Sequence, residues 1–169
     1  MRKIRYSVAM SLDGYIAGPN GEADWIVIDP EIDFEELAAG FDTLLVGRRT
    51  FETGSGGGMM PGMRTIVVSR TLTQADHPKV EVVADVGELA ELRDEAGKDV
   101  WLFGGGSLFR SLLDAGLVDA VEVAVIPLLL GGGVPLLPAG GGRAKLRLES
   151  SRVYETTGTV MLTYAVERR

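Results

Sequence analysis

Two adjacent arginines, Arg48 and Arg49, follow a short apolar run and a glycine in the sequence LLVGRRTFE of residues 44–52. This pattern predicts a strand that ends at Gly47 and a short helix that begins near Arg49. The free amides of a helix N-terminus favour an anion, and arginine offers a fork of donors matched to phosphate. Two solvated arginines are the alternative, although arginine in a first helical turn opposes the helix dipole and so favours a nearby anion.

A hydroxyl and a guanidinium, Ser69 and Arg70, stand at the end of the strand predicted for residues 65–69. Ligands of open α/β sheets bind outside the carboxyl ends of the strands. The pair could therefore hold a phosphomonoester, such as the 2′-phosphate that distinguishes NADP from NAD. An ordinary exposed loop is the other interpretation, and both stay open on these two residues alone.

Three consecutive glycines, Gly104, Gly105 and Gly106, separate a predicted strand from a predicted helix that starts at Ser107. Without a Cβ, the backbone can approach a ligand closely, and the helix amides can point at a pyrophosphate. The spacing departs from the G-x-G-x-x-G fingerprint, which disfavours a standard Rossmann site. A tight strand-to-helix turn is the alternative, but one glycine would suffice for that.

The sequence MSLDGYIAGPNGEADWI of residues 10–26 places polar residues after the first predicted strand. Ser11 and Asp13 could face a ligand there, although Asp13-Gly14 is also a common turn dipeptide. Trp25 could stack on a planar ring or lie in the core. His77, the single histidine, is expected to be a solvated loop residue, and with no cysteine in the chain no metal site is predicted.

Hydrophobic periodicity predicts an α/β fold in which strands and helices alternate before a β-rich tail. The terminal hairpin should add an antiparallel edge to a largely parallel sheet. Residues 54–62 are rich in glycine and show no periodicity, which predicts a loop. Strands are predicted at residues 4–10, 43–46, 65–69, 80–84, 99–103, 118–126, 146–154 and 160–166, and helices at residues 31–39, 86–96 and from 107 to about 115.

The length of 169 residues fits one domain, residues 1–169, and 46% hydrophobic residues can form a core. The net charge of -7 argues against nucleic-acid binding, which needs a basic surface. The longest apolar run, residues 121–130, is too short to span a bilayer. We therefore expect a soluble cytoplasmic protein with a small-molecule ligand.

Taken in order, GRRTFE, PGMRTIVVSR and FGGGSLFRSLL resemble the NADPH-binding segments of the dihydrofolate-reductase-like superfamily. MSLDGYIA with GEADWI, and VIPLLLGGGVPLLP of residues 125–138, resemble the reductase domain of the bifunctional riboflavin-biosynthesis enzyme and its short stand-alone relatives. The likeness covers about residues 3–166. It implies a single-domain, three-layer fold with a mixed, mostly parallel eight-stranded sheet, and it implies a homodimer.

The resemblance also implies roles for particular residues. Ser69 and Arg70 would hold the 2′-phosphate of NADPH, and Ser11, Asp13 and Gly14 would border the substrate. The remaining cofactor contacts would be Gly47, Arg48, Arg49, Thr50, Gly104, Gly105, Gly106, Ser107, Leu108 and Phe109.

The implied reaction is reduction by NADPH, as in 5-amino-6-(5-phosphoribosylamino)uracil reductase; reduction of dihydrofolate or another pteridine, and NADPH binding without catalysis, are the alternatives. Water or a carboxylic acid, Asp13 or Glu31, would deliver the proton. Asp29 and Asp33 compete with Glu31 for the position of the pteridine-binding acid. A substrate phosphate would need a cation, and Arg64, Arg143 and Lys145 are candidates.

Overall fold

The structure is a computed structural model, and it describes residues 1–53 and 60–168. The glycine-rich loop predicted for residues 54–62 falls mostly outside this part of the chain. In chain order the elements are β1 (Ile4–Ser11), β2 (Tyr15–Ala17), α1 (Phe34–Ala39), β3 (Phe41–Gly47), α2 (Arg48–Thr53), β4 (Arg64–Val68), β5 (Glu81–Val83), the 3-10 helix η2 (Val86–Arg93), β6 (Asp99–Gly104), α3 (Gly106–Asp114), β7 (Ala120–Ile126), β8 (Val134–Pro135), β9 (Leu146–Tyr154) and β10 (Thr159–Val166).

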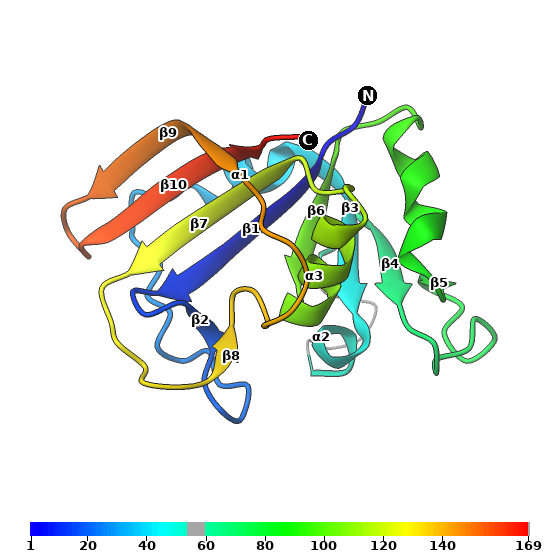
Figure 1. The fold of residues 1–169 in the computed structure, drawn as a ribbon, viewed down its shortest axis with the longest axis horizontal. Helices are drawn as coiled ribbons and strands as arrows, with labels where there is room; N and C mark the ends of the chain where they lie inside the picture. Colours follow the sequence, from blue (N-terminus) through cyan, green and yellow to red (C-terminus); the bar gives the residue numbers. More distant parts are fainter. Residues whose placement is uncertain (54–59, 169) are drawn as a thin grey trace.

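Eight strands form one sheet in the order β5-β4-β3-β6-β1-β7-β10-β9 (Figure 1). The pairs from β5 to β7 are parallel, and β10 pairs antiparallel with both β7 and β9. The carboxyl ends of β4, β3, β6, β1 and β7 therefore meet along one edge of the sheet. This is the edge at which ligands of open α/β sheets bind.

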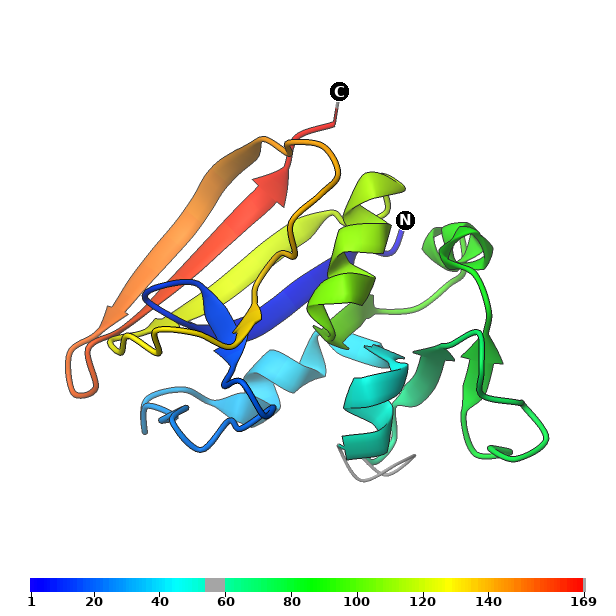
Figure 2. The ribbon, with the colours of Figure 1, turned by 60° about the horizontal axis from the view of Figure 1, so that its bottom comes forward.

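Both faces of the central strands are buried, which explains their nearly continuous apolar sequences. Leu45 and Leu102 belong to a core cluster that includes Leu112 of α3 and Leu89 of η2. Their neighbours Leu44, Val46 and Trp101 point to the other face, into a second cluster with Phe51 of α2 and Leu37 of α1. Helices thus lie on both sides of the sheet, and the predicted three-layer α/β fold is confirmed (Figure 2).

Two predicted helices differ from the observed ones. The helix expected over residues 31–39 begins only at Phe34, because the Asp33 carboxylate accepts the Glu36 amide hydrogen bond and caps it. The helix expected over residues 86–96 is a 3-10 helix that ends at Arg93. Three residues per turn place Leu89 and Leu92 on one face, and both are buried.

A second, two-stranded sheet pairs β2 with β8. The sequence analysis predicted no strand at Tyr15 or at Val134, since segments of two or three residues show no periodicity. Among the described residues, no helix combines the length and apolar character needed to cross a membrane.

Candidate active site

A cleft of about 1370 Å³ runs across the carboxyl ends of the parallel strands. It begins at Ser69, where β4 has ended, passes Gly47 of β3 and Gly104 of β6, and reaches Ala9 of β1 and Ile126 of β7. The sheet order therefore gives the cleft a direction, from the β4 end to the β7 end. All predicted cofactor contacts except Phe109 line it: Gly47, Arg48, Arg49, Thr50, Ser69, Arg70, Gly104, Gly105, Gly106, Ser107 and Leu108.

Phe109 lies in the core instead of the cleft. Its ring stacks on Tyr6 with 3.9 Å between centroids, and the residue is 3% exposed. Successive residues of a helix point in directions about 100° apart, so Leu108 faces the cleft while Phe109 faces the sheet. The assignment of Phe109 as a direct cofactor contact is therefore corrected.

The two arginines after β3 project from a helix of only six residues, α2. Arg48 lies 4.0 Å from the Glu52 carboxylate, and both side chains are about half exposed. Arg49 forms no ion pair with another described residue. Because so short a helix has a small dipole, most of the positive charge here comes from these guanidiniums.

The glycine triplet shapes the middle of the cleft. Gly105 has φ +101°, a backbone conformation that L side chains rarely adopt. It is the N-cap of α3 and provides no side-chain hydrogen bond, so no cap covers the first helix amides. A Cβ on Gly106 would lie 2.8 Å from the Pro135 carbonyl oxygen, so this glycine also lets α3 pack against β8.

At the β4 end of the cleft, Ser69 is 8% exposed and holds the turn that follows the strand. Its hydroxyl oxygen accepts hydrogen bonds from the amides of Thr71, at 3.2 Å, and Leu72, at 3.1 Å. Arg70 is exposed on this turn and has no ion pair with a described residue. Asp85, which caps η2, lines the same end and adds one negative charge to it.

Ser11, at the end of β1, and Asp13, just after it, do not line the cleft. The Asp13 carboxylate accepts hydrogen bonds from the Leu130 and Gly131 amides, at 3.0 and 2.8 Å, and from the Ser11 hydroxyl at 2.6 Å. These bonds, that of Ser11 above all, hold the pKa of Asp13 below its usual value. Gly14 turns the chain with φ +90°. In this arrangement Asp13 fastens the loop after β7 to the loop after β1.

Trp25 also lies outside the lining, and its indole N–H donates to the Glu22 carbonyl at 3.0 Å. Glu31 and Asp33 line a separate, neighbouring hollow. Asp29 is fully buried and accepts a 2.6 Å hydrogen bond from the Thr157 hydroxyl, which is the main reason that its pKa is lowered. None of the carboxylic acids considered as proton donors borders the cleft.

The β7 end of the cleft is apolar, and sequence reasoning missed it. We call it the apolar slot and define it by six residues: Ile28, Ile32, Phe34, Leu37, Trp101 and Met161. The rings of Phe34 and Trp101 lie 6.1 Å apart, and Trp101 meets Phe103 edge-on at 5.4 Å. The run WIVI at residues 25–28 was the available signal, because it is apolar and lies in no predicted element.

No group of three or more His, Cys, Asp or Glu side chains within residues 1–53 and 60–168 is arranged to hold a metal ion. The lining of the cleft instead combines guanidiniums, free helix amides and an aromatic wall. Such a set of donors fits a dinucleotide phosphate next to a planar ring.

This fold and cleft define a protein of the dihydrofolate-reductase-like class. The dihydrofolate reductase of Enterococcus faecalis, solved as a complex with NADP(H), superposes with a TM-score of 0.74 at 22% identity, over 98% of this chain and 97% of that one. At this identity the likeness concerns the fold alone.

Other comparisons, with higher sequence identity, assign the chain to one family within this class. Residues 2–161 match the model of the RibD C-terminal domain, and the chain belongs to this family. A putative riboflavin biosynthesis protein from Shewanella sp. PV-4 has a TM-score of 0.82 and 29% identity, over 99% of this chain and 100% of that one. The uncharacterized protein YyaP of Bacillus subtilis (strain 168) is 31% identical over 96% of this chain and 94% of its own length. The chain is thus related to the reductase of riboflavin biosynthesis.

Proposed function

We propose that the protein is an NADPH-dependent reductase of a small planar substrate. The observation that carries this proposal is the order of groups along one cleft: Arg70, then Arg49 with the glycine triplet, then the apolar slot. This order matches the parts of NADPH, because the adenosine phosphate and the pyrophosphate would meet the first two groups and the nicotinamide that follows them would face the slot, where the substrate binds. The family membership supports the same assignment.

In this proposal Arg70 binds the adenosine 2′-phosphate, and Arg48, Arg49 and the α3 amides bind the pyrophosphate. The glycine triplet lets the cofactor lie against the backbone without a Cβ in the way. When bound, NADPH supplies a hydride, and the protein contributes orientation and charge. Since neither Asp13 nor Glu31 borders the cleft, we assign the delivery of the proton to solvent water.

The substrate by family analogy is a ribosylaminopyrimidine, as for 5-amino-6-(5-phosphoribosylamino)uracil reductase, and dihydrofolate is the second candidate. A protein that binds NADPH without catalysis is the alternative from another class. Consumption of NADPH in the presence of a substrate separates the two classes, because a binding protein leaves the NADPH absorbance unchanged.

We also propose a homodimer, as the family resemblance implies. The outermost strand, β9, exposes Leu146, Leu148 and Val153 at 43%, 52% and 62%. Their partners in the register are Val166, Tyr164 and Val160, so these apolar side chains share one face of the sheet. Light scattering should give twice the mass of the chain, and the mass of a single chain would contradict the proposal.

Titration with NADPH and with NADH, followed by tryptophan fluorescence, tests the cofactor assignment, because Trp101 lines the cleft. We expect NADPH to bind at least tenfold more tightly than NADH, and Arg70→Ala to remove this preference. Arg64→Ala is the matched control, since Arg64 is held by Glu81 and Glu95 away from the cleft. Equal binding of the two nucleotides to the unchanged protein would contradict the role of Arg70.

A further inference from the structure

The apolar slot carries information about the substrate, on the basis of the proposed function. Phosphate-binding groups occupy the cleft from β4 to β6, so a bound dinucleotide leaves free the part above β1, β7 and β10. Ala9, Ile126 and Met161 form the floor of this part, and α1 with the loop before it forms the wall. This remaining space is where a substrate can meet the reactive end of the cofactor.

The wall of the slot exposes large apolar side chains. Val27, Ile28 and Phe34 are 56%, 57% and 45% exposed, although their types are usually buried. Exposure of apolar surface to water costs free energy, on the order of 25 cal/mol for each square ångström. A bound apolar ligand that covers this surface would regain that free energy. Phe34 offers an exposed ring face, which suits contact with a flat ligand. Trp101 is only 3% exposed and is stacked on Phe41, so it supports Phe34 from the core, with 6.1 Å between the ring centroids.

The wall is also fixed in place before any ligand binds. Asp29 is fully buried in the loop that carries Ile28 and Ile32, and it accepts the hydroxyl hydrogen of Thr157 at 2.6 Å. Thr157 lies in the turn between β9 and β10. The loop is therefore tied to the sheet, and the slot keeps its shape without help from the substrate.

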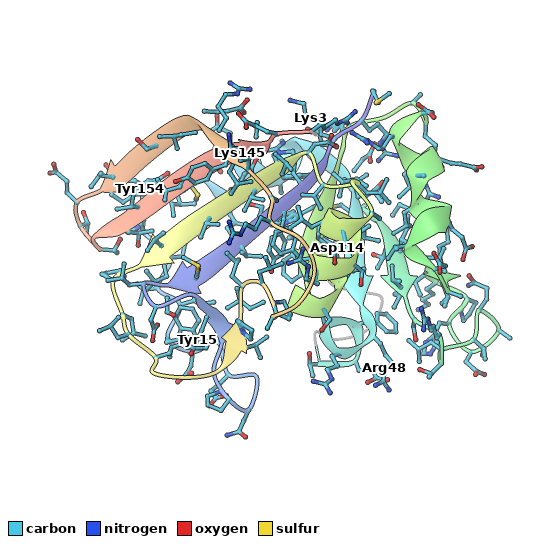
Figure 3. The ribbon with its side chains drawn as sticks, in the orientation of Figure 1. Lys3, Tyr15, Arg48, Asp114, Lys145 and Tyr154 are labelled. Atoms are coloured by element: carbon cyan, nitrogen blue, oxygen red, sulfur yellow. The ribbon has the colours of Figure 1, made fainter. Side chains whose placement is uncertain are left out.

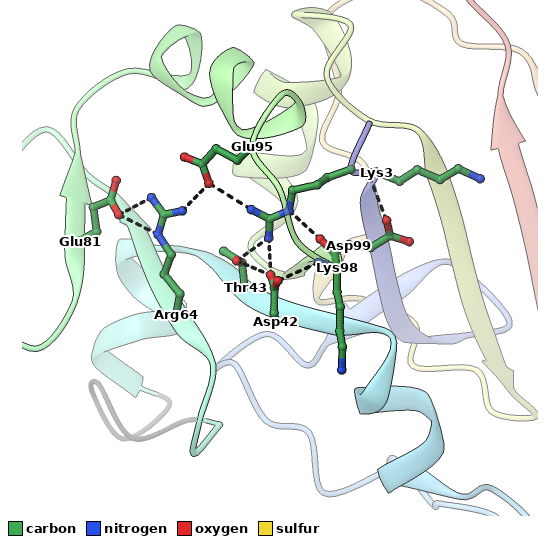
Figure 4. A network of polar contacts seen from close by, with 9 residues as sticks. Lys3, Asp42, Thr43, Arg64, Glu81, Glu95, Lys98 and Asp99 are labelled. Carbon is green, nitrogen blue, oxygen red and sulfur yellow. Dashed lines mark hydrogen bonds and ion pairs between the residues drawn. The ribbon is translucent and has the colours of Figure 1, made fainter.

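On the side of the cleft, no charged side chain among the described residues lines the slot. The charged residues of the cleft lining all belong to α2, the turn after β4 or the start of η2: Arg48, Arg49, Glu52, Arg70 and Asp85. None of the three cations considered for a substrate phosphate lines the cleft. Arg64 is bound to Glu81 and Glu95 (Figure 4), and Lys145 lies at the opposite side of the molecule from Arg48 (Figure 3).

The hollow next to the slot would repel an anion. It measures about 440 Å³ and shares Ile32, Leu37 and Met161 with the cleft. Its lining has four carboxyl groups, those of Glu31, Asp33, Glu36 and Glu122, against the two guanidiniums of Arg5 and Arg152.

Neither guanidinium is well placed to reverse this charge. Arg5 is already paired with Glu122 at 2.7 Å and with Asp99 at 3.2 Å. Arg152 lies over the Tyr154 ring at 4.6 Å. Among the described residues that line the hollow, it is the one cation that an anionic substrate could still recruit. A substrate phosphate would therefore meet more negative than positive charge beside the slot.

We infer that the slot takes an uncharged planar carbonyl or imine compound without a phosphate, in contrast to the phosphorylated substrate expected by family analogy. In the reaction, the carbon of the C=O or C=N bond gains a hydride from NADPH, the oxygen or nitrogen gains a proton from water, and NADP⁺ is released. Phe34, which Trp101 supports from the core, holds the ring by apolar contact, and the adjoining acidic hollow disfavours anionic analogues.

The test compares two rings that differ in one group, 4-methoxybenzaldehyde and 4-formylphenyl phosphate, by calorimetric titration of the protein saturated with NADP⁺. We expect the neutral ring to bind at least tenfold more tightly than the phosphate. Phe34→Ala should weaken the neutral ring about tenfold, whereas Leu129→Ala, which removes an exposed apolar side chain outside the cleft, should leave binding unchanged.

Equal or tighter binding of the phosphorylated ring, above all if Arg152→Ala then abolishes it, would overturn the inference. Failure of the neutral ring to bind would overturn it as well. The neutral ring is also titrated without NADP⁺, and NADPH binding is measured separately. If the protein binds the neutral ring but has no affinity for NADPH, the proposed function is contradicted. The assignment of the slot to a neutral planar ligand then still holds.

Discussion

The two halves of the cleft are built in different ways. The phosphate half consists of short local segments, each a strand end followed directly by glycine, arginine or serine. The apolar slot combines α1 and the loop before it with Trp101 of β6 and Met161 of β10, which are far apart in the sequence. In our proposal, the first half recognises charge that all dinucleotide phosphates share, and the second selects by shape and by the absence of charge. We therefore expect changes in the two halves to have separable effects.

The largest effect should come from Gly105→Ala. Only ordinary contacts surround a Cβ at this position, but φ +101° is strained for alanine, so the backbone at the pyrophosphate site must shift. We predict a loss of NADPH affinity on the order of a hundredfold, measured by fluorescence titration.

Gly116→Ala is the control for this strain. Gly116 has φ +71° with open space around it, at the other end of α3 and outside the cleft. It should lower the midpoint of thermal unfolding and leave NADPH affinity unchanged. If both variants lost affinity equally, the glycine triplet would have no special role in binding.

A smaller effect is expected for Arg49→Ala, which removes a guanidinium that has no ion pair among the described residues. NADPH and NADH share the pyrophosphate, so both should bind about tenfold more weakly, unlike the selective effect of Arg70→Ala. Arg147→Ala, on the exposed strand β9, is the charge-matched control. A loss confined to NADPH would move the 2′-phosphate site from Arg70 to Arg49.

The smallest effect should follow Asp29→Asn, which weakens the tie between the wall of the slot and Thr157. We predict a KM for the neutral aldehyde that rises about threefold, with unchanged NADPH affinity, because the wall is then less well ordered. A change in NADPH affinity as large as the change in KM would argue against the separation of the two halves.

Asp29 should also affect how the stability of the folded protein depends on pH. The folded protein lowers the pKa of Asp29, mainly through the Thr157 hydroxyl, so ionised Asp29 stabilises the fold above its unfolded pKa of about 3.9. This stabilisation is lost as the pH falls through the lower pKa of the folded state. Thermal unfolding measured from about pH 6 to pH 3 should therefore show a shallower decrease for Asp29→Asn than for the unchanged protein.

Sequence patterns placed residues correctly in the lining at the β4, β3 and β6 ends of the cleft, and they did not predict the slot. Arg48, Ser69 and Gly105 stand beside strand ends, where a ligand of an α/β sheet binds, so their position along the chain was enough to place them in the cleft lining. Leu37 and Trp101 look like core residues in any periodicity analysis, and they do contribute to a core cluster. Only the sheet order brings them together with Met161.

The role of Asp13 was also beyond the reach of local patterns. Its partners Leu130 and Gly131 lie more than a hundred residues away in the sequence, and they are backbone amides, which any residue type could provide. The α/β fold was easier to predict, because strands of five to eight residues with buried apolar runs are visible in the hydrophobic pattern, whereas β8 has only two residues.

A crystal structure of the protein with NADP⁺ tests the central claim most directly. The account predicts the 2′-phosphate within hydrogen-bonding distance of the Arg70 guanidinium, the pyrophosphate at the N-terminus of α3, and the nicotinamide ring facing the apolar slot. A dinucleotide bound in the reverse direction, or with its nicotinamide away from Phe34 and Trp101, would contradict the division of the cleft into a phosphate half and a substrate slot.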